Sequence, residues 1–484
     1  MVAYLGLAAC AILAYVIAWR EGVLRNNRRI FLSAFLIACA MALRALCMEH
    51  ETLDYQDFLH HWVEYFRSRG GVRALGENVG NYNVPYLYFL ALFSYSGIRD
   101  LYLIKLLSVV FDVLLAWGAL RLARKVSGSD GAALAAFLIT LLLPTVVLNG
   151  AYWGQCDSIY TAFGVWSLAY ALERKPVRAM AALALSFAFK LQAVFLIPVF
   201  LVLIYAGRVR WRDLPVFPLT YLAVVLPAVA LGRPLADTVL LYYNQMDTVG
   251  SALNYNSSSV YAFVSGTQTD PETLARAGVI AAFAFLLIIY VLCSIFRERL
   301  NDRTLLVCAV LISVGVPFLL PHMHDRYFFP ADVLSLILAV CVPALVPAAA
   351  AVSFASLLGY HAYLRMRFLL PMRYGAFALL GVIAVLTLML TGELLPQEKP
   401  EPARSAAGRS AAGRPAARGN AARSRAAGGQ AAGALPGGAA RKRARRQERD
   451  FALQSSRTQA RRRARQRSRM TLEQFFPGLR RDGR

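Results

Sequence analysis

The residues best suited to chemistry begin with a group of acids and histidines between two apolar stretches, at Glu49–Phe66. If a helix begins at Asp54, its polar side chains fall three or four positions apart and share one face. These side chains are Asp54, Asp57, His61 and Glu64. A carboxylate on such a face, turned toward a cavity or water, could act as a general base on a hydroxyl group. The alternative is structural, with Asp54 as the N-cap and Asp57 in the first turn, where acids are favoured.

Two cationic residues lie beside apolar runs. A charge at such a position is costly inside a bilayer, so both residues are candidates for a function. Lys190 separates two apolar runs, and Arg326 lies in a polar segment between two others. Both are expected near the outer interface, where lysine as a point charge and arginine as a fork could bind a phosphate. His322 and His324 could add donors, and their spacing with Asp325 is not diagnostic of a metal site. The alternative for Lys190 is that its amine reaches the lipid headgroups.

Two further polar clusters lie in predicted outer connections. Tyr152–Ser158 contains Gln155 and Asp157 and is also typical of an interfacial aromatic belt with a polar turn. Ser251–Ser257 contains Asn256, and its amides and hydroxyls suit sugar hydroxyls, although they are also ordinary loop residues. The sequence has no phosphate-binding glycine loop, no CxxC pair and no GxSxG motif, so soluble nucleotide chemistry is not indicated.

Composition places these residues in a membrane protein. Of 484 residues 58% are apolar, which is more than a water-soluble chain of this length could bury. We predict an all-α, polytopic transmembrane bundle of about 11–13 spans, because many apolar runs approach the ~20 residues that a span needs. The apolar stretch 85–97 is too short to span a membrane and suits an interfacial or re-entrant helix. The predicted segments are 1–19, 30–48, 100–122, 131–149, 157–172, 176–189, 191–206, 214–231, 276–296, 304–320, 327–343, 345–363 and 374–391.

Lysine and arginine in short loops predict the orientation of the bundle. The outer connections are then expected to carry most of the polar candidates, and the two longest are 49–99 and 232–275. The basic loops predicted to face the cytoplasm are 20–29, 121–125, 174–178, 208–212 and 297–303. Three further arginines fit this alternation less well, namely Arg365, Arg367 and Arg373.

The end of the chain differs in composition from the predicted transmembrane domain, residues 1–396. Residues 397–484 hold 23 Lys and Arg against 6 Asp and Glu, which is +17 of the net charge of +24. With few apolar clusters, this segment is predicted to be a disordered cytoplasmic tail that contacts anionic membrane lipids. No specific nucleic acid partner is expected. The seven cysteines, mostly inside apolar segments, predict neither a disulfide framework nor a metal site.

Five short motifs follow one another along the chain. They are Asp54-Tyr55-x-x-Phe58-x-x-x-Trp62 followed by Gly70-Gly71, then Asn81-Tyr82-Asn83-Val84-Pro85-Tyr86-Leu87-Tyr88, Trp153-Gly154-Gln155-x-Asp157-Ser158, Phe189-Lys190-x-Gln192 and His324-Asp325-Arg326-Tyr327-Phe328-Phe329-Pro330. Taken in this order, they resemble the polytopic glycosyltransferases of the GT-C superfamily, and within it prokaryotic relatives of the second mannosyltransferase of GPI-anchor synthesis. The resemblance covers about residues 30–360.

The resemblance implies an inverting hexosyltransferase in a prokaryotic cell membrane. It would transfer a sugar, mannose above all, from a polyprenyl-phosphate donor to a glycan or glycolipid acceptor on the extracytoplasmic face. Asp54 matches the catalytic acidic residue of the family's first outer loop, whose carboxylate would act as the base. Asp57 is the reserve candidate for this role. The resemblance implies no definite cofactor, and dependence on a divalent cation is left open. Candidates for the donor phosphate are Lys190, Arg326, His324 and Gln192. Candidates for substrate binding are Trp62, Asn83, Tyr86, Gln155, Asp157 and Asn256.

Other functions remain open at this stage. A transporter or flippase of a lipid-linked saccharide would use the same cations without needing Asp54 as a base, although the sequence has no inverted repeat. A membrane acyltransferase built around His322 or His324 would leave the acids of the first outer loop unexplained. A scaffold that recruits partners through its tail is the third alternative.

Overall fold

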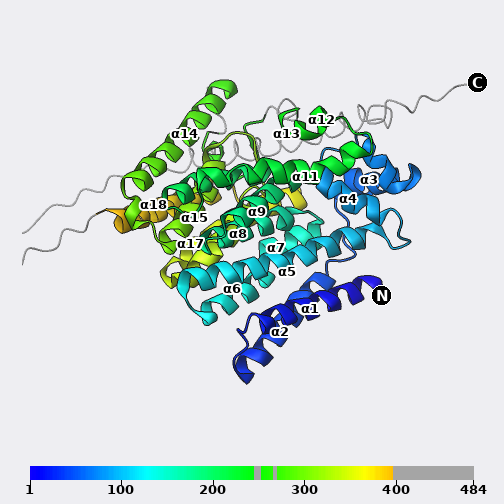
Figure 1. The fold of residues 1–484 in the computed structure, drawn as a ribbon, viewed down its shortest axis with the longest axis horizontal. Coiled ribbons are helices and arrows are strands. Elements are labelled where there is room, and N and C mark those ends of the chain that lie inside the picture. Colours follow the sequence, from blue (N-terminus) through cyan, green and yellow to red (C-terminus); the bar gives the residue numbers. More distant parts are fainter. Residues whose placement is uncertain (245–251, 265–269, 396–484) are drawn as a thin grey trace, which may run out of the picture. The chain divides into compact units, whose positions relative to one another are not determined.

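A computed structural model describes residues 1–244, 252–264 and 270–395, and the predicted basic tail lies outside the described residues. The described chain is mostly helical and contains one small parallel sheet (Figure 1). Its α-helices are α1 (Val2–Arg20), α2 (Asn27–Ala45), α3 (His60–Ser68), α4 (Val84–Phe93), α5 (Asp100–Ser127), α6 (Asp130–Leu142), α7 (Pro144–Val147), α8 (Asp157–Leu172), α9 (Pro176–Phe189), α10 (Ile197–Tyr205), α11 (Val216–Ala230), α12 (Leu235–Val239), α13 (Leu241–Asn244), α14 (Pro271–Ile295), α15 (Asp302–Leu319), α16 (Phe329–Cys341), α17 (Val346–Leu364) and α18 (Met372–Leu394). The π turns are η1 (Tyr55–Leu59) and η3 (Leu148–Trp153), and the 3-10 turns are η2 (Gly71–Gly76), η4 (Leu191–Phe195), η5 (Trp211–Asp213), η7 (Val260–Ala262), η8 (Arg297–Arg299) and η9 (Pro343–Leu345). The strands are β1 (Asn254–Tyr255) and β2 (Met323–His324).

Seven of the described helices are long and apolar enough to cross a membrane, and eight if the bent pair of α6 with α7–η3 is one span. The predicted all-helical class with several candidate spans is therefore confirmed. The number is below the predicted range because several apolar segments form shorter helices, among them α9, α10 with η4, and α16. The predicted non-spanning segment contains α4, whose 10 residues are about 15 Å long, half of the ~30 Å hydrocarbon core.

Two helix breaks lie next to the polar candidates. Leu143 is extended (ψ 123°) because it precedes Pro144, and the helix axis bends there by 43°. The second break follows α9, where Lys190 has extended backbone angles (φ −157°, ψ 136°) before η4 begins. At each break the backbone leaves the helical hydrogen-bonding pattern, and the side chains that follow point in directions that a continuous helix would not allow.

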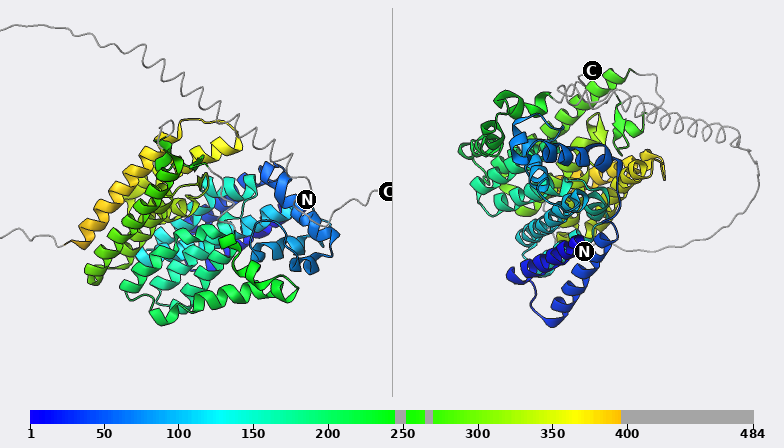
Figure 2. Two further views of the ribbon diagram at one scale, coloured as in Figure 1. Left: turned by 90° about the horizontal axis from the view of Figure 1, so that it is seen from above. Right: turned by 90° about the vertical axis from the view of Figure 1, so that its right-hand side faces the viewer.

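The long helix α5 is the centre of the bundle. It packs against α1, α6, α8 and α16, and α8 in turn packs against α9. The pair α1 and α2 lies along the edge of the bundle, against α5 and α6 (Figures 1 and 2). Because α5 has 28 residues and is therefore about 42 Å long, its two ends mark opposite ends of the bundle.

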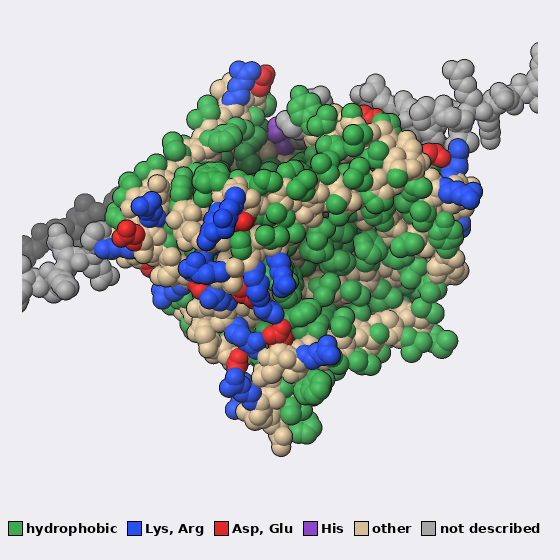
Figure 3. All heavy atoms as spheres, in the orientation of Figure 1, with side chains coloured by type: hydrophobic (Ala, Val, Ile, Leu, Met, Phe, Trp, Pro, Cys, Tyr) green, Lys and Arg blue, Asp and Glu red, His purple; other side chains and the backbone are tan. Residues whose placement is uncertain are grey.

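The basic loops predicted to share one membrane side meet at the C-terminal end of α5. Arg124 Nη1 lies 2.8 Å from Glu21 Oε2, and Arg121 Nη2 lies 2.6 Å from Glu173 Oε1. Other ion pairs at this end are Arg25–Asp130, Lys125–Asp302, Arg208–Asp302 and Arg303–Glu393. Most Lys and Arg side chains on the visible face gather toward the left, and hydrophobic side chains cover the area beside them (Figure 3). We call this the basic end of the bundle.

A buried ion pair joins α2, α5 and α8. Arg44 Nη2 and Nε lie 2.8 Å and 3.0 Å from Asp112 Oδ2, and both side chains are fully buried. Ser158 Oγ donates to Asp112 Oδ1 at 2.5 Å, and Arg44 Nη1 donates to the carbonyl of Leu141 at 2.8 Å. Because a buried charge without a partner costs several kcal/mol, this pair holds the three helices in one arrangement.

We predict that Arg44→Leu lowers the free energy of unfolding by about 3–5 kcal/mol, because Asp112 would be left as a buried, unpaired charge. Thermal unfolding of the detergent-solubilised protein measures this as a lower midpoint. Arg44→Leu combined with Asp112→Leu should recover most of the loss. The matched control is Arg276→Leu, which breaks the exposed Arg276–Glu272 pair and should leave the midpoint nearly unchanged. Equal losses in Arg44→Leu and the double variant would contradict the prediction.

Candidate functional site

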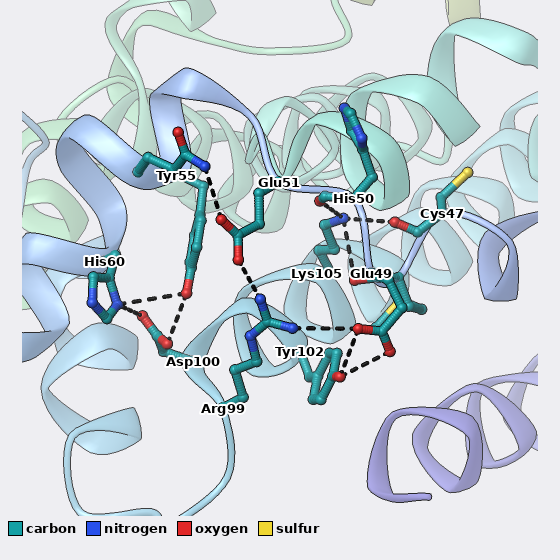
Figure 4. Close-up of polar contacts among 12 residues, drawn as sticks. Cys47, Glu49, His50, Glu51, Tyr55, His60, Arg99, Asp100, Tyr102 and Lys105 are labelled. Carbon is teal, nitrogen blue, oxygen red and sulfur yellow. Dashed lines mark hydrogen bonds and ion pairs between the residues drawn. The ribbon is translucent and has the colours of Figure 1, made fainter.

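The segment that carries Asp54 is fixed by a lysine inside the bundle. Lys105, a buried residue of α5, donates from Nζ to the carbonyls of Cys47 and His50 at 2.7 Å and 2.6 Å. These carbonyls follow the C-terminal end of α2, where backbone oxygens lack helical partners. Figure 4 displays Lys105 beside this segment. Thr52 Oγ1 then donates to the carbonyl of Trp153 at 2.9 Å, which joins the segment to η3 just before Asp54.

Ionic and hydrogen-bonded contacts hold the same segment on its outer side (Figure 4). Arg99 pairs with Glu51 and, at 3.3 Å, with Glu49. Asp100, which directly follows Arg99, accepts a hydrogen bond from the Tyr55 hydroxyl at 3.0 Å, and its Oδ2 lies 2.8 Å from His60 Nδ1. Asp54 is therefore anchored to the N-terminal end of α5 on both sides of its position in the chain.

The π turn η1 changes which side chains share a face. Asp54 has helical backbone angles (φ −63°, ψ −35°) and makes no capping hydrogen bond, so the interpretation of Asp54 as an N-cap is wrong. Because a π turn adds a residue to each turn, the regular spacing expected from Asp54 to Glu64 is interrupted. Asp57 is exposed, and it is His60, not His61, that contacts Asp100.

Three side-chain donors hold the carboxylate of Asp54. Trp153 Nε1 and Gln155 Nε2 donate to Oδ2 at 2.8 Å and 2.6 Å. The hydroxyl of Tyr363, from the last turn of α17, donates to Oδ1 at 2.5 Å. Hydrogen bonds to the charged form stabilise a carboxylate as an anion. The sequence also allowed Tyr152–Ser158 to be an interfacial aromatic belt. Trp153 is fully buried, so this role does not fit it.

A left-handed glycine directs Gln155 toward Asp54. Gly154 has φ +80°, which L side chains rarely adopt, and it ends the π turn η3. The next residue is held by its backbone, because Gln155 N donates to the carbonyl of Asn149 at 2.9 Å and its own carbonyl accepts from Ser108 Oγ at 2.7 Å. Its side-chain oxygen accepts from the Tyr82 hydroxyl at 3.2 Å.

The second acid, Asp157, lies deeper than Asp54 and is paired with Lys190. Both side chains are buried, and they form an ion pair. Asn149 Nδ2 donates to the other oxygen of Asp157 at 2.7 Å. The Lys190 amine also lies over the rings of Tyr82 and Tyr160, at 5.7 Å and 6.0 Å from their centres. The side chain does not extend to the surface, so the snorkelling interpretation of Lys190 is wrong.

Arg326 lies between the two acids without a close hydrogen bond to either. Its Nη1 is 3.6 Å from Asp54 Oδ2, and its Nε is 3.7 Å from Asp157 Oδ2. These distances exceed hydrogen-bond length. Nε is buried and has no hydrogen-bond partner among the described residues, and the guanidinium lies 5.1 Å from the centre of the Trp153 ring. We call Asp54, Asp157, Lys190 and Arg326 the charge cluster.

His324 and Asp325 border the charge cluster. β1 and β2 pair in parallel with Tyr255 opposite His324, and the two rings stack at 4.5 Å. Burial, with Arg326 and Lys190 nearby, lowers the pKa of His324 to about 3, so this imidazole is neutral and adds no third cation. Burial raises the pKa of Asp325 to about 7, although Arg326 acts in the opposite direction. Asp325 Oδ1 is buried and unbonded within the described chain.

The remaining predicted substrate residues lie around the cluster in different ways. Trp62 and Tyr86 are both buried and pack against Tyr82, with 5.4 Å and 5.1 Å between ring centres. Asn83 caps α4, since its Oδ1 accepts from the backbone of Val84 at 2.8 Å.

The last two candidates for binding the substrate or the donor phosphate, Gln192 and Asn256, lie in two other segments of the chain. Gln192 lies in η4, two residues after Lys190, and its Oε1 is buried. Asn256 has a left-handed backbone (φ +60°) directly after β1. Its carbonyl and that of Asp325 lie so close to Gly359 that a Cβ there would be 2.8 Å and 2.9 Å away.

The predicted motifs of Asp54, Gln155, Asp157, Lys190 and Arg326 therefore meet in one place. Neither Tyr363, which lies at the end of an apolar segment, nor Asn149 stands out in the sequence. No group of three or more His, Cys, Asp or Glu side chains that could hold a metal ion occurs in residues 1–244, 252–264 and 270–395.

Comparison of the chain with protein-family models and with curated proteins finds no match. The resemblance to the GT-C superfamily therefore stays an expectation drawn from five short motifs. What the protein does has to be argued from the chemistry that the charge cluster can perform.

The pKa of Asp325 predicts a dependence of stability on pH. The folded protein binds this proton more tightly than the unfolded chain, so the stabilisation is complete below the ordinary carboxyl pKa of 3.8 and is lost as pH rises to about 7. Asp325→Asn cannot lose a proton. Between about pH 4 and 7 the thermal midpoint of the wild type should therefore fall relative to that of this variant, and above pH 7 the difference between the two should be constant. A difference that is the same at every pH would contradict this.

Proposed function

We propose that this chain is a membrane glycosyltransferase that moves a hexose from a polyprenyl-phosphate carrier to a hydroxyl group of a glycan or glycolipid. Mannose is the sugar that the family resemblance favours. The observation that carries the proposal is the charge cluster itself, in which Asp54 is oriented by three donors next to Lys190 and Arg326. A base beside two cations is what sugar transfer from a phosphate leaving group requires.

In the proposed reaction the acceptor oxygen forms a bond to C1 of the donor sugar. Asp54 takes the proton of the acceptor hydroxyl, and the bond between C1 and the phosphate oxygen breaks with its electron pair going to the phosphate. A single displacement inverts the configuration at C1. The polyprenyl phosphate leaves as an anion, so it needs cations rather than a general acid.

Arg326 is the better placed of the two cations for first contact with the phosphate. Its distances to Asp54 and Asp157 are too long for hydrogen bonds, and its Nε has no hydrogen-bond partner in the described chain, so its donors are available. Lys190 is paired with Asp157. A phosphate that approached Lys190 would have to share it with that carboxylate, so Lys190 acts mainly by adding positive charge to the cluster.

The two ends of the bundle support an extracytoplasmic site. The basic end collects the short loops rich in arginine, which membrane proteins retain in the cytoplasm. The charge cluster lies toward the other end of α5, near Tyr55 and Asp100. Glu393 pairs with Arg303, so the described chain ends at the basic end, in keeping with a cytoplasmic tail. A lipid-linked donor facing outward is the substrate that such a site would meet.

We predict that Asp54→Asn abolishes transfer, with a loss of about 10²–10⁴-fold in kcat, because an amide cannot accept the acceptor proton. The measurement is release of polyprenyl phosphate by purified protein supplied with a panel of polyprenyl-phosphate sugars. Asp57→Asn is the matched control, since Asp57 is exposed and should be dispensable. Normal transfer by a folded Asp54→Asn protein would exclude Asp54 as the base. Loss in Asp57→Asn alone would give that role to Asp57.

We also predict that Arg326→Gln lowers kcat/KM for the donor by about 10²–10³-fold, because it removes a donor group from the leaving phosphate. Arg326→Lys should recover only part of the loss, since an ammonium lacks the fork geometry of the guanidinium. The matched control is Arg297→Gln, an exposed arginine at the basic end. Equal effects of Arg297→Gln and Arg326→Gln would contradict a role at the phosphate.

A further inference from the structure

The two oxygens of Asp54 have different kinds of partner. Oδ2 accepts from two N–H groups, those of Trp153 and Gln155, and faces the guanidinium of Arg326. Oδ1 accepts from a hydroxyl, that of Tyr363, at 2.5 Å. The carboxylate therefore has one oxygen fixed by nitrogen donors of the site and another bonded to an O–H group.

This difference decides which oxygen can act as a base. An oxygen that accepts two N–H bonds has both lone pairs occupied. Its negative charge is also stabilised by the adjacent guanidinium, which makes Oδ2 the weaker base. Oδ1 is bonded to an O–H donor, the same chemical group that a sugar acceptor presents. An acceptor hydroxyl can replace that bond one for one, without leaving a buried carboxylate oxygen unpaired.

The position of Tyr363 allows such an exchange. It lies in the last turn of α17, and its ring stacks on Trp153 with 4.6 Å between centres. Arg365–Leu370, directly after it, are exposed. The tight packing of α17 occurs one turn earlier, at Gly359, where the backbone of Asp325 leaves no room for a Cβ. A turn of the Tyr363 side chain away from Asp54 would give up its stack on Trp153 but would leave the close packing at Gly359 in place.

We infer that the Tyr363 hydroxyl occupies the binding position of the acceptor hydroxyl, and that Asp54 Oδ1 is the atom that takes the acceptor's proton. This inference rests on the proposed function. Without acceptor, Tyr363 holds Oδ1 and keeps water from using the base, which protects the donor from hydrolysis. An acceptor hydroxyl displaces Tyr363 and gives its proton to Oδ1 as its oxygen bonds to C1, while the bond between C1 and the phosphate oxygen breaks and its electron pair goes to the phosphate. The glycosylated acceptor and the polyprenyl phosphate leave, Oδ1 gives its proton to water, and the Tyr363 hydroxyl then donates to Oδ1 again.

The test compares full-length wild type, Tyr363→Phe and Tyr363→Leu in liposomes. Polyprenyl-phosphate mannose is the donor, and water alone or methyl α-mannoside is the acceptor probe. Loss of one competing hydrogen bond to a charged group corresponds to about tenfold in occupancy. We therefore expect donor hydrolysis in water to rise about tenfold in Tyr363→Phe. The methyl α-mannoside concentration at half-saturation should fall by about as much.

The controls separate this inference from the proposed function. Tyr4→Phe, which removes an exposed hydroxyl from α1, should behave as the wild type. Tyr363→Leu should raise hydrolysis as Tyr363→Phe does, which guards against an effect of the ring alone. Unchanged or slower hydrolysis in folded Tyr363→Phe and Tyr363→Leu, with a wild type that transfers mannose, would overturn the role of Tyr363 and leave the proposed function standing. A folded wild type that releases no polyprenyl phosphate with any donor sugar or acceptor would overturn both.

Discussion

The constraint on which the site depends is the cost of an isolated charge inside a membrane bundle. A buried carboxylate or ammonium without a partner costs several kcal/mol, so each must lie beside an opposite charge. In the charge cluster two carboxylates, Asp54 and Asp157, balance two cations, Lys190 and Arg326. These residues come from four separate segments of the chain. Their mutual neutralisation therefore requires those segments to meet, and it selects one packing of the helices around α5.

The irregular backbone of the bundle follows from that requirement. Gly154 provides the left-handed turn that brings Gln155 against Asp54, and the break after α9 releases Lys190 from the helix so that it reaches Asp157. Lys105 bonds to the carbonyls that follow α2 and so fixes the approach to Asp54. Non-helical backbone is costly in a membrane unless its polar groups are satisfied within the protein, and here the side chains of α5 satisfy several of them.

Two groups in and beside the charge cluster have a buried polar atom without a hydrogen-bond partner in the described chain. Arg326 is held by charge and by the face of Trp153 rather than by close hydrogen bonds, and the pKa of Asp325 lies near neutrality. The donors of Arg326 are therefore available to an anionic ligand, and burial favours the neutral form of Asp325, which limits the negative charge that the site must hold. In the proposed reaction the two oxygens of Asp54 have separate roles, because Oδ2 is held by N–H donors whereas Oδ1 accepts from a hydroxyl.

The sequence by itself determined the class of the molecule and most of the reactive side chains. Long apolar runs predict membrane helices whatever their neighbours are, and Asp54, Lys190 and Arg326 stand out because a charge beside such a run is costly. Only the tertiary structure decided how they pair. The π turn at Tyr55–Leu59 interrupts the predicted face, and Lys190 takes Asp157 as its partner rather than lipid. Tyr363 had no sign in the sequence, because its hydroxyl meets Asp54 across 309 positions of the chain. Periodicity reports only local geometry, whereas contacts of that range depend on which helices pack together.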